Sequence, residues 1–440
     1  MSYLARDNTI TLIKPMTPFR FSLLFVVALL LTTLAKLWLA RRHLAHIAAH
    51  RTEVPQAFRE KIDLAAHQKA ADYTSAKTRF AMLGTLFDAA LLLAFTVCGG
   101  IQWIADFWLH TFASPIAQGM SIIVSVLLLS SLLETPFDLY RTFVIEARFG
   151  FNKMTLALYL IDALKGMLLG AAIGLPLLFG VLWLMERMGG NWWLYVWGVW
   201  VTFNLLLLFL YPSFIAPLFN KFQPLQDESL KTRIEALLLK CGFTASGLFV
   251  MDGSKRSSHG NAYFTGFGKT KRIVFFDTLL ERLTPSEVEA VLAHELGHFK
   301  QRHVAKRIAL TFIMSLAFLW LLAQLMQAGW FYAGLGVIST TSSGQAASTA
   351  LALLLFFLIL PVFSFLMHPL MAAYSRKHEF EADAYAARQT AAHDLSSALV
   401  KMYQDNAATL TPDPLYSTFY DSHPPALVRI NKLQTLGANA

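Results

Sequence analysis

The amino-acid sequence predicts an all-α polytopic membrane protein of about seven transmembrane helices, with a small α+β insert that carries a metal-binding helix. Three observations lead to this fold class. The 440 residues are 55% hydrophobic and only 15% charged, several apolar runs are long enough to cross a bilayer, and one polar central segment contains two histidines four residues apart. With a mean hydropathy of +0.48, the chain is too apolar for a soluble globular protein.

Seven runs have the roughly 20 residues needed to cross a hydrocarbon core of about 30 Å. They are expected at 21–40, 81–105, 116–135, 156–185, 192–213, 308–333 and 349–374. The first run is followed by Arg41-Arg42 without a small-residue cleavage pattern, so we expect a retained span and no signal peptide. The predicted division is a five-span membrane domain (1–213), a cytosolic insert (214–307), spans six and seven (308–374) and a C-terminal cytosolic segment that completes the site (375–440).

The distribution of positive charge predicts the orientation. On this topology 31 of the 37 Lys and Arg residues lie on one side, four lie on the other and two lie within spans. Because cytoplasmic segments carry the excess of Lys and Arg, the insert and the C-terminus are expected in the cytosol. The net charge of +9 is thereby assigned to membrane topology, and no nucleic-acid partner is expected. Cys98 and Cys241 form no disulfide framework and no metal-ligand spacing.

Four ionisable residues, Lys36, Asp88, Asp162 and Lys165, lie inside predicted spans. The favoured interpretation is snorkelling at span ends for Lys36 and Asp88, and an i, i+3 ion pair between Asp162 and Lys165. A water-filled interior is the alternative.

The central segment reads as a small soluble unit. Two amphipathic connectors, 141–155 and 211–224, are expected at the membrane interface. A helix is expected over 226–241, and extended runs are expected at 247–251, 262–266 and 272–276. These runs predict a small sheet in which one strand is free to pair with an extended peptide.

Residues 287–307 are predicted to form the metal-binding helix, which a capping box from Thr284 to Glu287 begins. On a helix His294 and His298 lie one turn apart on one face, so both imidazoles can hold one metal ion while Glu295 stands beside a water on that ion. This is the zincin signature. An ordinary solvated helix is the alternative.

A catalytic zinc usually takes three protein ligands, so a third must come from elsewhere. The downstream candidates are His303, His368, His378, Glu379, Glu381, Asp383, His393 and His423. On a helix Glu379 and Asp383 share a face, whereas Glu381 is turned roughly 200° away. From spacing alone, an ordinary charged helix surface is as good an interpretation of these residues as a metal ligand with its supporting carboxylate. The segment 375–404 is expected to be a polar helix, and 405–425 a loop.

Several motifs together give a specific resemblance. They are Glu146-x-Arg-x-Gly-Phe-Asn152, the connector from Tyr211-Pro to Pro224, Ser254 to Gly268 with its Asn261-Ala-Tyr-Phe, Lys271 to Leu280, His294-Glu-Leu-Gly-His298, Ser375-Arg-x-x-Glu379-x-x-Ala-Asp383 and Ser422-His-Pro-Pro425. In this order they resemble the CAAX prenyl protease 1 family of integral-membrane zinc endopeptidases, over about residues 134–432. The resemblance implies a large water-filled chamber within a barrel of seven helices.

The resemblance also implies roles for individual residues. One Zn²⁺ per chain would be held by His294, His298 and Glu379, and Asp383 would orient a ligand histidine. Glu295 is expected to act as the general base.

On the substrate side, the resemblance implies that His423 helps to stabilise the oxyanion. Asn261 and Ala262 would bind the substrate backbone, and Arg429 would lie close to the site, as a further substrate-binding residue. His423 as a cap of a turn and Asn261 as a turn residue are the structural alternatives.

The sequence thus predicts a membrane-embedded zinc metalloendopeptidase whose partners are the lipid bilayer and a peptide or protein substrate. Prenylated CAAX-type proteins and misfolded or stalled membrane proteins are both open as substrates. The last residues, 435–440, show no dilysine-type retrieval signal, which favours a bacterial inner-membrane member over an endoplasmic-reticulum enzyme. The alternative function is a transporter or channel with a structural zinc site and no proteolysis.

Overall fold

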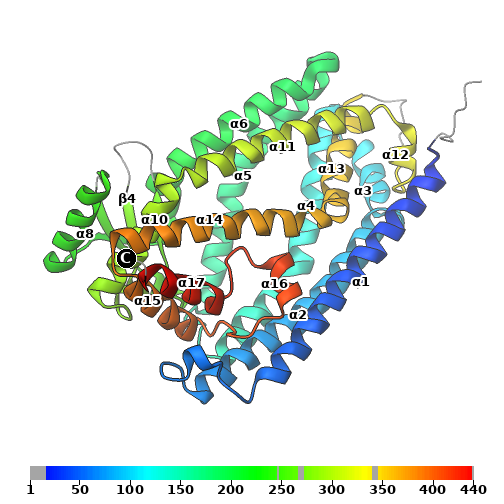
Figure 1. The fold of residues 1–440 in the computed structure, drawn as a ribbon. Coiled ribbons are helices and arrows are strands. Elements are labelled where there is room, and N and C mark those ends of the chain that lie inside the picture. Colours follow the sequence, from blue (N-terminus) through cyan, green and yellow to red (C-terminus); the bar gives the residue numbers. More distant parts are fainter. Residues whose placement is uncertain (1–15, 245–246, 266–271, 339–344, 439–440) are drawn as a thin grey trace, which may run out of the picture.

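The computed structural model describes residues 16–244, 247–265, 272–338 and 345–438. Long helices make up most of the molecule, and a small sheet with its own helices lies at one end, at the left of Figure 1. The predicted fold class, a helical polytopic membrane protein with a small α+β insert, is confirmed.

Long helices dominate the N-terminal half. They are α1 (Pro18–His50), α2 (Leu64–Phe95), α3 (Gly100–Leu109), α4 (Pro115–Tyr140), α5 (Leu156–Arg187) and α6 (Trp192–Leu210). The side chains of Thr17, Asp63, Ser114 and Thr155 cap four of them by accepting hydrogen bonds from first-turn amides. Large apolar side chains stay exposed on these helices, as expected of a surface that faces lipid.

Six of the described helical segments are long and apolar enough to cross a membrane, and a bent pair supplies a seventh. The later members are α11 (His303–Leu325), α13 (Gln345–Phe363) and α14 (His368–Gln389), with the short α12 (Gly329–Ala333) between the first two. The bent pair joins α13 to α14 at an angle of 51°. The break lies at Ser364, and a 3₁₀ turn, Phe365–Met367, joins the two helices.

Two predicted spans have different borders in the structure. The expected run 81–105 is broken, because α2 ends at Phe95 and the chain turns through Gly99, whose φ of +83° lies in the left-handed region that favours glycine. The expected run 308–333 stops at Leu325, where α11 ends. These turns are as apolar as the helices that they join, so hydropathy does not mark them.

Two of the predicted connectors begin as continuations of helices. After α4 and α6 the chain widens into π-helical turns at Arg141–Glu146 and Tyr211–Ile215, and the second turn runs into α7 (Ala216–Phe219). Such turns carry an extra residue per turn and re-aim the chain that follows. The first turn leads to α5 through a segment in which Asn152 bridges to Ser257 of the insert, and the second turn leads to the insert itself.

The insert holds a four-stranded sheet in the order β1-β2-β4-β3. Its strands are β1 (Phe222–Pro224), β2 (Gly247–Met251), β3 (Ala262–Thr265) and β4 (Arg272–Phe276), and its helices include α8 (Glu228–Cys241) and α9 (Asp277–Leu280). β2 and β4 run parallel, and the two outer strands pair antiparallel to them. Phe275 and Ile273 of β4 lie buried in one core with Leu296 of the metal-binding helix, so the sheet supports that helix directly.

The metal-binding helix α10 (Pro285–Lys300) begins at the predicted capping box, with both reciprocal hydrogen bonds of Thr284 and Glu287 present. The expectation of one helix over 287–307 is wrong at its end. Arg302 adopts φ +57° and ψ +33°, which ends one helix and lets α11 begin at His303 in a new direction. A left-handed residue interrupts the helical hydrogen-bond pattern although its neighbours favour helix.

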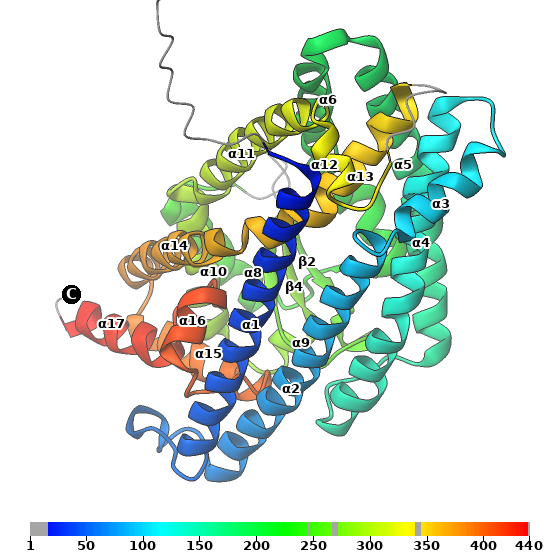
Figure 2. The same cartoon turned by 90° about the vertical axis from the view of Figure 1, so that its right-hand side faces the viewer.

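The C-terminal segment wraps back against the insert and the first helix. It contains α14, α15 (Ala392–Asp405), α16 (Pro414–Tyr420) and α17 (Ala426–Ala438). The expected polar helix is therefore two helices, and the expected loop contains α16, which begins at an Asp413 cap. Tyr416 stacks on His43 of α1 with ring centroids 4.0 Å apart, which places this segment beside the first span (Figure 2).

The ionisable residues within spans differ from the favoured interpretation. Asp162 pairs with Arg256 of the insert, with Nε and Oδ2 2.9 Å apart, and Lys165 donates to the backbone of Leu218. The predicted Asp162–Lys165 ion pair is therefore wrong, because the insert folds back over α5 and offers a better partner. Lys36 and Asp88 line a cavity of about 290 Å³ between helices, in keeping with a wet interior.

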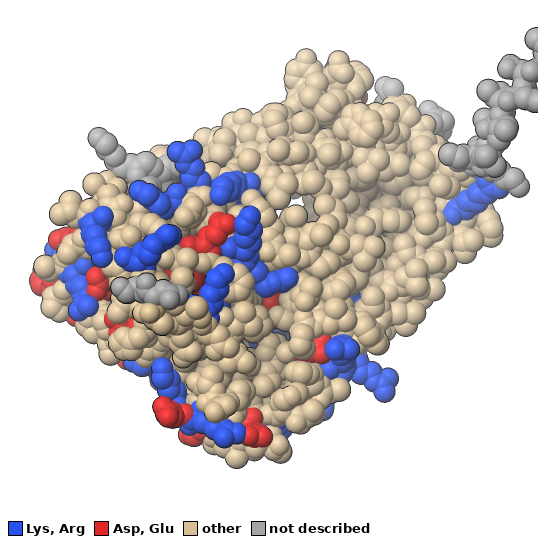
Figure 3. All heavy atoms as spheres, in the orientation of Figure 1, with Lys and Arg blue, Asp and Glu red and all other residues tan. Residues whose placement is uncertain are grey.

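Charged residues gather at the insert end of the molecule. On the face that Figure 3 shows, Lys, Arg, Asp and Glu cluster over α8, α10, α15 and α17, whereas the surface over α5, α6 and α11 is almost free of charge. A broad uncharged belt beside a charged end is the surface expected of a protein whose helices lie in lipid and whose insert lies in water.

Candidate active site

Two helices far apart in the sequence bring the three expected metal ligands together. α10 contributes His294 and His298, and α14 contributes Glu379. The two Nε2 atoms lie 3.2 Å apart, His294 Nε2 lies 3.5 Å from Glu379 Oε2, and His298 Nε2 lies 3.4 Å from Glu379 Oε1. The three donor atoms thus surround one point, although His294 and Glu379 are only 7% and 4% exposed.

Close packing of the two helices makes this approach possible. Gly297 lies between the two histidines, and a Cβ at that position would come within 2.9 Å of the Ala382 Cα in α14. Since real side chains do not approach backbone so closely, only glycine allows α14 to lie this near.

These three side chains fit a zinc ion. Ligand arms of about 2.0–2.1 Å in a tetrahedral site put neighbouring ligand atoms roughly 3.3–3.4 Å apart. The distance between the two Nε2 atoms, and the distance from each Nε2 to one of the two Glu379 carboxylate oxygens, are close to this. Glu379 Oε2 is also buried with no hydrogen-bond partner among the described residues. A buried carboxylate oxygen without a partner is costly unless a cation satisfies it. Three protein ligands leave one position open, as in catalytic zinc sites.

The outward nitrogen of His294 contacts Asp383. His294 Nδ1 lies 2.8 Å from Asp383 Oδ1, which favours a tautomer in which Nδ1 carries the proton and Nε2 faces the metal position. Burial lowers the pKa of His294, but the Asp383 and Glu379 carboxylates more than offset it and raise the pKa to about 9.

Arg429 of α17 holds Asp383 in turn. Its Nε and Nη2 donate to the two carboxylate oxygens of Asp383 at 2.9 and 2.6 Å, and the residue is only 5% exposed. The same guanidinium lies 3.7 Å from Glu379 Oε2. These contacts place Arg429 behind the metal ligands. Its predicted role in substrate binding stays a prediction, whereas its support of Asp383 rests on direct hydrogen bonds.

His298 is neutral in this environment. Burial lowers its pKa to about 3, and the neighbouring His294 charge adds to the effect. Its Nδ1 lies 3.0 Å from Nδ1 of His303, the first residue of α11. A neutral imidazole is the form that binds a metal, so His298 is ready to act as a ligand.

Glu295 lies beside His294 on α10 and is partly buried. Burial raises the pKa of its carboxyl above the usual range. The carboxylate forms no hydrogen bond with the residues that the structure describes. A base with a raised pKa and free oxygens can accept a proton from a water molecule and release it again.

His423 approaches the site from the C-terminal segment. Its Nε2 lies 3.5 Å from Glu379 Oε1, and its side chain is 62% exposed. Ser422 and His423 Nδ1 are 3.0 Å apart, which holds the ring in place. A developing oxyanion needs a hydrogen-bond donor beside the metal position, and the His423 nitrogen stands there.

Asn261 and Ala262 lie at the outer edge of the sheet. β3 is an edge strand, and in its antiparallel pairing with β4 Ala262 faces Phe275. Phe276 donates to the Asn261 carbonyl at 2.9 Å, so by the alternation of antiparallel ladders the backbone groups of Ala262 point away from the sheet. Asn261 Oδ1 accepts from the Ala262 N–H at 2.8 Å. Among the described residues no strand pairs with this outer edge of β3. Phe264 packs beside Phe299 of α10, with ring centroids 5.1 Å apart.

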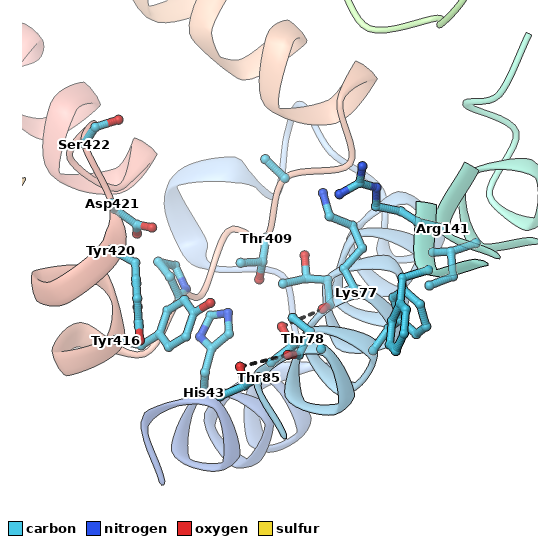
Figure 4. A pocket seen from close by; sticks show the side chains of 18 of the residues that line it. His43, Lys77, Thr78, Thr85, Arg141, Thr409, Tyr416, Tyr420, Asp421 and Ser422 are labelled. Atoms are coloured by element: carbon cyan, nitrogen blue, oxygen red, sulfur yellow. Dashed lines mark hydrogen bonds between the residues drawn. The ribbon is translucent and has the colours of Figure 1, made fainter. Parts of the chain in front are cut away.

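A cavity of about 930 Å³ lies between helices on the side of the site where His423 stands. His423 lines it together with residues of α1, α2, α4 and the C-terminal segment. In Figure 4 Lys77 and Arg141 lie on one side of the cavity, and Tyr416, Tyr420 and Asp421 lie on the other. A polar cavity enclosed by membrane helices matches the expected chamber.

The sequence reasoning missed two neighbours of the site. His303 was weighed only as a metal ligand and Glu381 was set aside because it points away from Glu379, yet His303 Nε2 lies 2.8 Å from Glu381 Oε2. The spacing of His303, five residues after His298, could have drawn attention to it. The left-handed turn at Arg302, which returns His303 to His298, is not visible in the sequence.

Two family descriptions match the chain along most of its length. Residues 43–221 match the CAAX prenyl protease N-terminal family of five membrane helices, and residues 224–436 match peptidase family M48.

Individual relatives agree with these matches. The Saccharomyces cerevisiae CAAX prenyl protease 1 is 33% identical over 87% of this chain and 88% of the yeast protein. The Homo sapiens CAAX prenyl protease 1 homolog is 32% identical over 94% of this chain and 96% of the human protein. Among solved structures, the crystal structure of S. mikatae Ste24p superposes with a TM-score of 0.88 at 31% identity, over 95% of this chain and all of that one.

Proposed function

Because this chain belongs to the CAAX prenyl protease 1 family of M48 peptidases, and so is a multi-pass membrane zinc metalloendopeptidase, we propose how its own residues bind and cut a substrate. The observation that carries the proposal is the meeting of His294, His298 and Glu379 beside His423, which itself lines a cavity between membrane helices. A transporter with structural zinc is not favoured, since the chain is a peptidase by family and the site offers three protein ligands.

His294, His298 and Glu379 would hold one zinc ion per chain. When bound, the ion supplies Lewis-acid chemistry that activates water and stabilises negative charge on a carbonyl oxygen. Asp383, held by Arg429, keeps the His294 tautomer that presents Nε2 inward.

Glu295 and His423 would move the protons and bear the charge of the reaction. The Glu295 carboxylate accepts the proton of the attacking water, and passes it to the leaving amine when the peptide bond breaks. His423 Nε2 donates a hydrogen bond to the oxyanion that forms at the scissile carbonyl. Both side chains are kept in reach of the same point by α10 and by the Ser422–His423 contact.

The edge strand β3 would position the peptide. An extended substrate that pairs with the outward backbone groups of Ala262 and Phe264 gains main-chain hydrogen bonds without any demand on its side chains. The Asn261 side chain, which now occupies the Ala262 N–H, would turn to the substrate instead.

Replacement of Asn261 by Ala tests this edge. We expect kcat/KM for peptide cleavage to fall by about 3-fold to 10-fold, as for the loss of one neutral hydrogen bond, while zinc content stays unchanged. Gln223→Ala, an exposed position on the opposite edge strand β1, is the matched control and should cleave normally. Equal losses in both variants would show that β3 has no special role.

A second cavity supports a proposal for the substrate class. A space of about 840 Å³ between α5, α6, α11 and α13 is lined mainly by apolar side chains, and Tyr420 and Ser422 line both this space and the polar cavity. An apolar chain could enter it while an attached peptide lies at the metal site. We therefore propose substrates that combine a peptide with a hydrophobic moiety, either a prenylated C-terminal peptide or a segment of a misfolded or stalled membrane protein.

A cleavage assay with purified protein separates these substrates. We expect a farnesylated peptide to be cut with a higher kcat/KM than the same peptide without the lipid, because the apolar chain adds binding energy. A zinc chelator should stop both reactions, and added zinc should restore them. If lipid made no difference while an unfolded membrane protein was cut, quality control would be the supported role; cleavage that persists in chelator would contradict the metal mechanism.

We propose the orientation from the charge distribution, and the placement in a bacterial inner membrane is a separate proposal. A reporter fused to the C-terminus should be cytosolic, and one placed between α12 and α13 should be on the far side of the membrane. The reverse pattern of reporter activity would overturn this orientation.

A further inference from the structure

The second ligand histidine has a support of its own. On the premise of the proposed function that His298 binds zinc through Nε2, we infer that His303 and Glu381 form a hydrogen-bonded relay that positions His298. The contacts are His298 Nδ1 to His303 Nδ1 at 3.0 Å and His303 Nε2 to Glu381 Oε2 at 2.8 Å. His303 and Glu381 touch no substrate in this proposal and act only through His298.

The hydrogen atoms of this relay can be placed in one consistent way. With Nε2 given to the metal, His298 carries its proton on Nδ1 and donates to His303 Nδ1. His303 must then be a neutral imidazole with its proton on Nε2, which it donates to the Glu381 carboxylate. Each nitrogen has one partner and one role, so the relay selects the His298 tautomer that binds metal.

The backbone is shaped to bring His303 to this place. Arg302 holds a left-handed conformation that a residue with a side chain rarely adopts, and the turn it makes returns His303 toward His298. His303 is 1% exposed and stacks on His378 of α14, with ring centroids 4.0 Å apart and planes at 10°. The ring is thus fixed on its face by stacking and on its edge by two hydrogen bonds.

The relay completes a symmetrical support from one helix. Along α14, Glu379 is the ligand, Asp383 contacts the first histidine, and Glu381 reaches the second through His303. Glu381 points away from Glu379, but α11 begins on the side of α14 that Glu381 faces. Glu381 can therefore contact His303, the first residue of α11. Its side chain is 34% exposed and has only a distant second partner in Lys377, at 4.0 Å.

A second metal ion held by His303, His378 and Glu381 is the competing interpretation, since their donor atoms lie within 4.8 Å of one another. Two features argue against it. The histidine rings are nearly parallel, so their in-plane lone pairs run alongside each other and do not converge on one point. Both nitrogens of His303 are also already engaged, by His298 and by Glu381.

The test is the zinc affinity of the full-length protein in detergent, measured by competition with a chromophoric chelator, together with zinc content by mass spectrometry. His303→Ala should bind zinc about 10-fold to 100-fold more weakly than wild type, the usual effect of losing a residue that supports a ligand. His303→Asn, whose amide oxygen can take the place of Nδ1, should return to within about fivefold of wild type.

Glu381 variants keep the test valid if His303→Ala does not fold. Glu381→Gln retains an acceptor oxygen and should stay within about threefold of wild type, whereas Glu381→Ala should bind zinc about tenfold more weakly. His393→Ala, which removes an 82% exposed histidine, is the control and should match wild type.

The outcomes distinguish the relay from the proposed function. Wild-type zinc affinity in both His303→Ala and Glu381→Ala would overturn the relay alone, provided that Glu379→Ala loses zinc. Retention of zinc by Glu379→Ala would overturn the ligand assignment on which the relay rests. Two zinc ions per wild-type chain, with one lost in His303→Ala, would replace the relay by a second metal site.

Discussion

Replacement of Glu295 by Gln is expected to lower the rate of peptide cleavage by at least about 100-fold while zinc remains bound, because loss of a general base typically costs 10²–10⁴ in rate. Glutamine keeps the size and hydrogen-bonding ability of the side chain but cannot accept the proton. Glu295 is not one of the three side chains that face the metal position, so its replacement leaves the ligand set intact. The measurement is kcat on a peptide substrate beside zinc content per chain.

A control on the same helix makes this result specific. Glu289 lies on α10 and pairs with Arg233 at the surface of the insert. Because partly exposed ion pairs contribute little to the stability of the fold, Glu289→Gln should keep both its zinc and its activity. If Glu295→Gln cleaved peptide at nearly the wild-type rate with full zinc content, the proton transfer would have to be assigned to another residue.

Replacement of Glu379 by Ala should remove the zinc itself. Structural zinc sites bind the ion with a free energy of roughly 10 kcal/mol, to which each ligand contributes. Losing one ligand should therefore weaken zinc binding on the order of 100-fold or more. The two remaining histidines would still face each other with Nε2 atoms 3.2 Å apart. Zinc affinity is measured by chelator competition, and peptide cleavage should fall to background at low free zinc.

Two observations would qualify or contradict the second prediction. Excess zinc should partly restore zinc occupancy in Glu379→Ala, since His294 and His298 remain. Glu235→Ala, an exposed carboxylate on α8, is the control and should bind zinc as wild type does. Wild-type zinc affinity in Glu379→Ala would show that the third ligand is another residue, and His423, with Nε2 3.5 Å from Glu379 Oε1, would be the first to examine.

The local parts of this protein could be predicted from the sequence. The start of α10 at Thr284, the shared face of His294 and His298, and the strands β2 and β4 all depend on contacts within a few residues, which composition and periodicity record. The membrane helices were visible for the same reason, since about 20 apolar residues can satisfy their backbone only as helix in lipid.

Breaks between elements were less visible. The turn at Gly99, the left-handed Arg302 and the bend before α14 interrupt runs that have a continuous helical or apolar pattern. Apolar turns inside a membrane protein do not carry the polar residues that mark turns in water. Span borders and the end of the metal-binding helix were therefore misplaced.

The pairing of distant side chains depends on the tertiary structure. Local patterns predict a helix with two histidines and a glutamate, and they show that carboxylates follow about 80 residues later. How α10, α11 and α14 cross decides which carboxylate meets the histidines and that Glu381 reaches His298 through His303. The pairing of Asp162 with Arg256 depends on how the insert packs against α5. Crossing geometry is set by packing of whole helix surfaces, such as the close approach at Gly297, and no local pattern records it.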